Sequence, residues 1–97
     1  MTLAEFRTSL AAGTPPDGLH VALQSLWQDA KGDWSAAHKL VQSCEGEGKC
    51  DWVHAYLHRK EGDLSNAGYW YRRAGQTMPD GSLEAEWETI AQTLLAK

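Results

Sequence analysis

An internal repeat with a period of 30 residues limits this chain to a small set of folds. When residues 26–46 are aligned with residues 56–76, the string GDWSAA falls on GDLSNA. A helix–turn–helix repeat of 20 to 50 residues is typical of proteins built from stacked helical hairpins. We therefore predict an all-α fold in which each Gly-Asp pair joins two helices. The matched residues are Gly32, Asp33, Ser35 and Ala37 in the first unit, and Gly62, Asp63, Ser65 and Ala67 in the second.

Apolar periodicity and capping residues predict six helices in a single domain that covers residues 1–97. Thr2 and Glu5 form the pattern of a capping box for the first helix, which Gly13 ends. Asp17 is expected to cap the second helix, which continues to Ala30. The remaining predicted helices cover residues 35–44, 51–61 and 65–74, and a sixth starts at Ser82.

The second repeat unit resembles a tetratricopeptide helix pair, although its period is shorter than that family's. The residues that fall at the family's spacing are Gly62, Asp63, Ala67, Tyr71, Ala74 and Pro79. The resemblance implies two antiparallel tetratricopeptide-like hairpins, flanked by an N-terminal and a C-terminal helix. Residues 52–75 also resemble a group of small bacterial and fungal proteins with no established activity.

The tetratricopeptide register also implies two candidate sites on the helix predicted over residues 51–61. His54 and His58 stand where the family tends to have apolar and aromatic residues, and they are expected to face the partner helix. Trp52, Tyr56 and Arg59 are expected to line an open groove.

The charge and cysteine content exclude several classes of function. Nine Lys and Arg against 13 Asp and Glu give a net charge of −4, which argues against nucleic acid or an anionic membrane as a partner. The sequence shows neither the pattern of an export signal nor an apolar run long enough to span a bilayer. We therefore predict a cytoplasmic protein in which Cys44 and Cys50 are reduced thiols.

A metal site is one alternative for the histidines. His54 and His58 are one helical turn apart, so both imidazoles can reach one ion, and Cys50 precedes His54 by four residues. Cys44 and His38 are further candidate ligands. However, the cysteine and histidine spacing matches no zinc motif that we can assign, and the HExxH pattern is absent. We expect no metal or other cofactor and interpret the histidines first as hydrogen-bonded structural groups.

Catalysis by histidine is a second alternative. His38, His54 or His58 has the chemistry of a general base, and Asp33, Asp63 or Glu61 could orient the imidazole. No nucleophile elbow, glycine-rich phosphate loop or dinucleotide fingerprint accompanies them. A small metal- or histidine-dependent enzyme centred on these three histidines is therefore the alternative function, and we do not expect an enzyme.

A binding module is the function that the composition favours. Aromatic and arginine side chains are concentrated between residues 52 and 73, and this combination is enriched in interfaces, although it also suits the core of a small domain. Asn66 has three open roles: to cap a helix, to bond to His58, or to face a ligand. We predict a non-enzymatic module for a protein or small-molecule partner. The C-terminal helix has two open roles: to cap the helical array within the same chain, or to pack on a second copy in a homodimer. The predicted binding residues are His38, Trp52, His54, Tyr56, His58, Arg59, Asn66, Trp70 and Tyr71.

Overall fold

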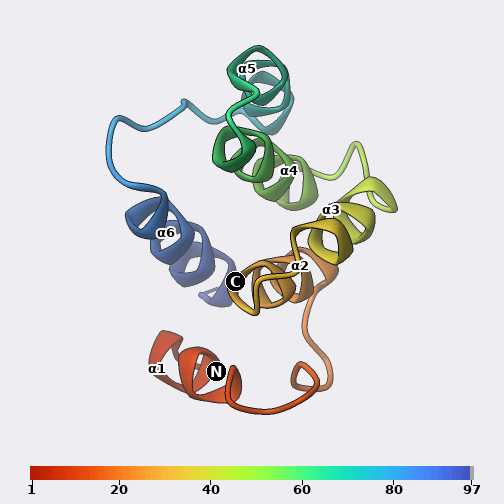
Figure 1. Cartoon of the computed structure of the whole chain (residues 1–97), viewed down its shortest axis with the longest axis vertical. Coiled ribbons are helices and arrows are strands. Elements are labelled where there is room, and N and C mark those ends of the chain that lie inside the picture. The colour runs from red at the N-terminus through yellow and green to blue at the C-terminus, as the bar shows by residue number, and fades with distance from the viewer. Residues whose placement is uncertain (97) are drawn as a thin grey trace.

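The structure is a computed structural model that describes residues 1–96. Within these residues it contains six helices and no strand, which confirms the predicted all-α fold (Figure 1). The helices are α1 (Leu3–Ser9), α2 (Val21–Ala30), α3 (Trp34–Gln42), α4 (Gly48–Glu61), α5 (Leu64–Ala74) and α6 (Leu83–Leu95). The molecule measures 34 × 26 × 25 Å.

The helices are arranged as two hairpins with a flanking helix at each end of the chain. The hairpins α2/α3 and α4/α5 meet where α3 packs against α4 (Figure 1). Helix α6 packs against α2 and α4, and α1 contacts α6. Helix α4 thus touches α2, α3, α5 and α6, and its residues 53–58 are all buried. The helices on both sides of α4 determine which of its side chains reach solvent.

The two Gly-Asp pairs form the same turn, as the repeat predicts. Gly32 and Gly62 adopt left-handed backbone conformations with φ of 88° and 89°, which glycine tolerates best. The Asp33 and Asp63 side chains each accept a hydrogen bond from the backbone N–H three residues further on, at 3.0 and 3.3 Å. The N–H of each Asp donates to the carbonyl five residues earlier, at 3.0 Å in both turns. The local chemistry of this dipeptide therefore ends one helix and starts the next.

Helix α2 begins later than the sequence predicts. Asp17 does not cap it, because Gly18 follows with a left-handed φ of 80°, which interrupts any helix there. The cap is His20, whose Nδ1 accepts a hydrogen bond from the N–H of Ala22 at 3.0 Å. At the N-terminus the predicted capping box is present, with Thr2 and Glu5 bonded to each other's backbone N–H groups at 3.1 and 2.8 Å.

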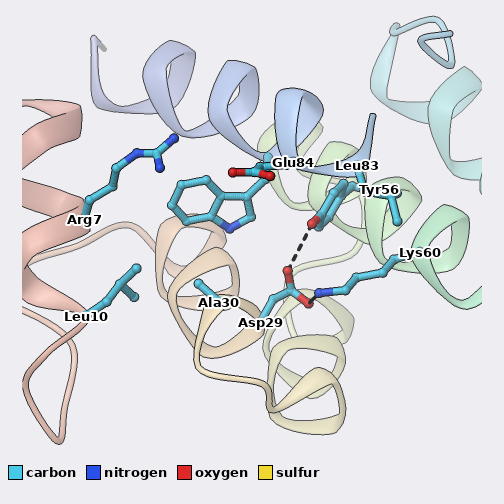
Figure 2. A pocket seen from close by; sticks show the side chains of 9 residues that line it. Arg7, Leu10, Asp29, Ala30, Tyr56, Lys60, Leu83 and Glu84 are labelled. Atoms are coloured by element: carbon cyan, nitrogen blue, oxygen red, sulfur yellow. Dashed lines mark hydrogen bonds and ion pairs between the residues drawn. The ribbon is translucent and has the colours of Figure 1, made fainter. Parts of the chain in front are cut away.

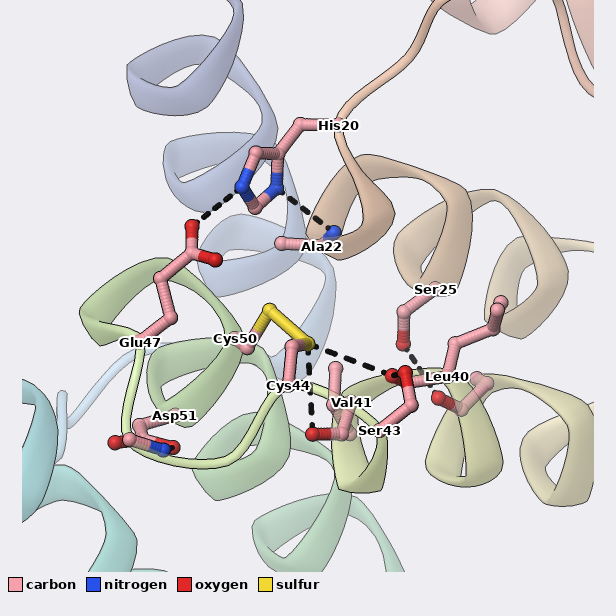
Figure 3. Close-up of a disulfide and its surroundings, with 12 residues drawn as sticks. His20, Ala22, Ser25, Leu40, Val41, Ser43, Cys44, Glu47, Cys50 and Asp51 are labelled. Carbon is pink, nitrogen blue, oxygen red and sulfur yellow. Dashed lines mark hydrogen bonds and ion pairs between the residues drawn. A yellow bond between two sulfur atoms is a disulfide. The ribbon is translucent and has the colours of Figure 1, made fainter.

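The two cysteines form a disulfide, so the prediction of reduced thiols is wrong for this structure. Cys44 lies just beyond the end of α3 and Cys50 in the first turn of α4 (Figure 3). The short loop between these helices brings the two Cα atoms within 6.0 Å, a separation suited to a disulfide. The bond also means that Cys50 offers no thiolate to a metal ion here.

The amphipathic helices supply the buried core. Within residues 1–96, none of the helices has the length and apolar character needed to cross a bilayer. The largest fully buried side chains include Trp27, Tyr71, Phe6 and Leu26. The cytoplasmic location stays a prediction.

Candidate metal centre

Three imidazoles meet where α3 packs against α4. His54 and His58 are one turn apart on α4, and His38 reaches them from α3. Each offers a ring nitrogen, and these three atoms all lie within 4.8 Å of one another. His54 and His58 are 2% and 6% exposed, and His38 is half-buried. The pairing of His54 with His58 was predicted from their spacing, and the α3/α4 packing brings to them His38, which was predicted as a further candidate ligand.

Two tryptophans hold the imidazoles in place. The Trp34 ring stacks on His38 with centroids 4.7 Å apart and planes at 11°, and its Nε1 donates to the carbonyl of Leu57 at 2.9 Å. The Trp70 ring from α5 stacks on His54 with centroids 4.0 Å apart. Stacking on these indoles limits large rotations of the His38 and His54 rings and leaves small ones possible.

His58 is held in the tautomer that suits a metal ligand. Its Nδ1 donates to the Glu61 carboxylate at 2.6 Å, because an ionised carboxylate can only accept. In the neutral ring the proton is therefore on Nδ1 and the lone pair is on Nε2. The Asn66 amide nitrogen donates a long hydrogen bond of 3.4 Å to this Nε2. Of the three roles left open for Asn66, the structure shows the contact with His58.

His38 and His54 share a hydrogen bond between identical atoms. Their Nε2 atoms are 3.1 Å apart, so one ring donates a proton to the lone pair of the other. The other nitrogen of His54, Nδ1, is buried and has no hydrogen-bond partner within residues 1–96. A buried polar atom without a partner costs about 1–3 kcal/mol, so the unpaired Nδ1 requires a physical explanation, of which a bound ion near the ring is one.

The surroundings keep these rings neutral. Burial, with the nearby His58 and His38 as further causes, lowers the pKa of His54 to about 4. Burial also lowers the pKa of His38, and a charge on His58 acts in the same direction. At neutral pH each ring therefore has one proton and one lone pair, and both Nε2 atoms can bind one ion once the donating ring moves its proton to Nδ1.

Two other groupings of potential ligands are less suited to a metal ion. One contains His20, Glu47 and Cys50. There Cys50 is in the disulfide, and His20 uses its Nδ1 lone pair to cap α2, so its Nε2 holds the proton and donates to Glu47. The other combines His58 with the exposed Glu61 and Asp63, and in it Glu61 already binds the Nδ1 proton of His58.

The open groove predicted over Trp52, Tyr56 and Arg59 does not form from these residues. Tyr56 is only 3% exposed, and its hydroxyl donates to Asp29 at 3.1 Å. Lys60 donates to the second Asp29 oxygen at 2.9 Å, and these three residues line one side of a cavity of about 290 Å³ (Figure 2). The face that the sequence left open is covered by α2 and α6.

Arg59 and Tyr71 belong to a second buried polar network. The Arg59 guanidinium donates to Glu86 of α6 at 2.8 Å and also to the Gly81 carbonyl, and the Tyr71 hydroxyl donates to the other Glu86 oxygen. Burial raises the pKa of Tyr71, so its hydroxyl keeps its proton. Trp52 is half-buried beside these residues and lines a separate cavity along α6.

Of the nine predicted binding residues, five therefore converge at one place: His38, His54, His58, Asn66 and Trp70. Sequence reasoning missed Trp34 as part of this site. Trp34 precedes His38 by four residues, so the two share a helix face, which is the signal that could have found it.

Comparison with known proteins finds no match to a family model, to a curated protein or to a solved structure. The resemblance to tetratricopeptide repeats and to the group of small bacterial and fungal proteins thus remains a prediction.

Proposed function

We propose that this chain is a metal-binding helical module that holds one divalent transition-metal ion on His38, His54 and His58. The observation that carries the proposal is the convergence of three imidazole nitrogens from two helices within 4.8 Å. The sequence predicts a ligand-binding module, and the proposal agrees with this prediction. The two differ in the ligand, because we expected no metal ion from the sequence.

The distances support a tetrahedral ion. Zn–N bonds of 2.0–2.1 Å at tetrahedral angles place two ligand nitrogens roughly 3.4 Å apart. The Nε2 atoms of His38 and His54 are 3.1 Å apart, close to this value. Because the longest separation in the group is at most 4.8 Å, a closure of no more than about 1.4 Å completes the triangle. Small side-chain rotations supply such a shift.

The ligand type favours zinc, copper or nickel over calcium or magnesium. Imidazole nitrogen suits these transition metals, whereas calcium and magnesium prefer oxygen. The Glu61 carboxylate on the Nδ1 of His58 is the outer partner that metal-bound histidines usually have. Three protein ligands leave a fourth position for water or an exchangeable ligand.

The test is titration of untagged, metal-free protein with Zn²⁺ and Ni²⁺, followed by calorimetry and elemental analysis. We expect one ion per chain, and a loss of more than about 100-fold in affinity for His38→Ala and His54→Ala, because each removes a direct ligand rather than an outer partner. The matched control is His20→Asn, which removes the fourth histidine but keeps a capping side chain for α2.

Two results would overturn the proposal. One is the absence of stoichiometric binding by the wild-type chain, and the other is an equal loss of affinity in His20→Asn. Circular dichroism of each variant checks that it is folded. Titration with Co²⁺ provides a second readout, because its visible spectrum reports nitrogen ligation in a tetrahedral site.

A further inference from the structure

We infer that the Cys44–Cys50 disulfide regulates the metal affinity of the histidine cluster, so that reduction weakens binding. This inference rests on the proposed function. It follows from which helices the disulfide and the three ligands join.

The disulfide and the metal cross-link the same two helices. The disulfide joins Cys44, just after α3, to Cys50 in the first turn of α4 (Figure 3). Cys44 is six residues beyond His38, and Cys50 is one turn before His54. A bound ion would join His38 of α3 to His54 and His58 of α4. Each link therefore limits how far α3 can shift along α4.

Only one of the three ligands depends on that shift. His54 and His58 are on the same helix, so α4 alone sets their separation. His38 comes from α3, and its distance to His54 changes whenever α3 moves relative to α4. The disulfide thus restricts the position of His38 and leaves the His54–His58 pair unaffected.

The helices remain packed after reduction, because other contacts also fix α3. The Trp34 indole bonds to the Leu57 carbonyl of α4 at 2.9 Å, and the Ser25 hydroxyl of α2 donates to the Ala37 carbonyl at 2.8 Å. Reduction is therefore expected to widen the range of His38 positions without unfolding the domain. A partial loss of affinity follows, of the size typical of coupled sites.

The two cysteines differ in burial. Cys50 is fully buried and Cys44 is half-buried, so we expect a dithiol to attack Cys44. A thiolate of the dithiol attacks Cys44 Sγ, the S–S bond breaks, and Cys50 leaves as a thiolate that takes up a proton. The second thiol of the reductant then displaces Cys44, which also gains a proton, so two electrons and two protons reach the protein and the dithiol becomes a disulfide.

The reduced state has partners ready for the new thiol. Cys44 Sγ lies 3.4 Å from the carbonyl oxygen of Leu40 and 3.5 Å from that of Val41 (Figure 3). These distances suit weak hydrogen bonds from a thiol. The reduced chain can therefore keep the end of α3 folded, which lets the disulfide open and close on a stable domain.

Linkage makes the effect reciprocal. If oxidation raises metal affinity by a given factor, the metal favours the disulfide by the same factor. We expect a factor of about ten, within the range usual for coupled sites. For a two-electron couple this corresponds to a reduction potential about 30 mV more negative in the metal-bound protein.

The test is a cycle of four proteins titrated with Ni²⁺: the oxidised wild type, Cys44→Ser/Cys50→Ser, His38→Ala, and the triple variant. Serine removes the disulfide without adding thiol ligands. We expect the double cysteine variant to bind Ni²⁺ about tenfold more weakly than the wild type. In the His38→Ala background the serine substitutions should have no effect, because the ligand that the disulfide positions is gone.

Equal affinities of the wild type and the double cysteine variant would overturn the inference, as would a loss of the same size in the His38→Ala background. Failure of the oxidised wild type to bind any metal would instead contradict the proposed function. If the double variant unfolds, the reduction potential of the wild-type disulfide tests the coupling instead. This potential is measured in glutathione buffers with and without buffered Zn²⁺. It should be about 30 mV more negative with Zn²⁺, and an unchanged potential would refute the coupling.

Discussion

Glu61 Oε2 lies 2.6 Å from Nδ1 of His58, three residues earlier on α4. This contact fixes the His58 proton on Nδ1 and leaves the lone pair on Nε2, where a metal ion would replace the Asn66 amide as its partner. A carboxylate in this position also makes the imidazole a better donor to a metal. Glu61 therefore acts on the proposed ion through His58 and need not touch it.

Glu61→Gln is expected to reduce Zn²⁺ affinity about tenfold, the lower end of the effect of outer-shell partners, because the amide oxygen still accepts the hydrogen bond but lacks the charge. Glu61 is exposed, so stability in the absence of metal should change by less than about 0.5 kcal/mol. Calorimetric titration and denaturant unfolding measure the two quantities. Glu84→Gln on the surface of α6 is the control and should bind as the wild type does. Unchanged affinity in Glu61→Gln would exclude this role.

The pKa of His54 predicts how stability depends on pH in the metal-free protein. Burial lowers this pKa from 6.5 to about 4, so between these values the unfolded chain binds a proton that the folded chain does not. Stability should therefore fall as the pH decreases from 6.5 to 4, by about 3 kcal/mol from this group, and then level off. Urea unfolding at a series of pH values in the presence of a chelator measures the slope.

The control for the pH dependence is the same experiment on His54→Leu and His20→Asn. Removal of the imidazole at position 54 should reduce the slope between pH 6.5 and 4, whereas His20→Asn should leave most of it. Identical slopes in the wild type and His54→Leu would show that His54 titrates alike in the folded and unfolded chains.

The parts of the fold that could be predicted from sequence are those determined locally. The Gly32-Asp33 and Gly62-Asp63 turns follow from glycine's backbone freedom and from a capping carboxylate, so the repeat identified both hairpins. The late start of α2 depends on the left-handed conformation of Gly18, for which a Pro-Pro-Asp-Gly loop gives only a general turn signal.

The site depends on long-range packing, which is why it was predicted only in part. The four-residue spacing indicated that His54 and His58 share a helix face. The approach of His38 and the Cys44–Cys50 bond require the register of α3 against α4, which no local pattern specifies. Tyr56 was expected on an open face for the same reason, since its burial requires α2 and α6 to cover α4.

The equivalence of the two turns makes a quantitative prediction. Asp33→Ala and Asp63→Ala each remove an N-cap hydrogen bond and should each cost about 1 kcal/mol. Because the two turns are separate, the double variant should lose about the sum. Denaturant unfolding of the three variants and the wild type checks this, with Ser65→Ala as the control for an exposed residue at the start of α5. A cost confined to one of the two aspartates would contradict the equivalence.

Glu86 is expected to be a sensitive polar position outside the histidine cluster. It is 5% exposed and accepts hydrogen bonds from Arg59 and Tyr71, which joins α6 to α4 and α5. Glu86→Leu leaves the largely buried Arg59 without its carboxylate and should cost about 3–5 kcal/mol. Tyr71→Phe keeps the ion pair and should cost about 1 kcal/mol.

The decisive comparison is the Arg59→Met/Glu86→Leu double variant, since removing both charges leaves no unpaired charge. Denaturant unfolding should show the double variant to be more stable than Glu86→Leu alone. If the double variant is instead less stable than either single variant, the network stabilises the fold by more than charge pairing.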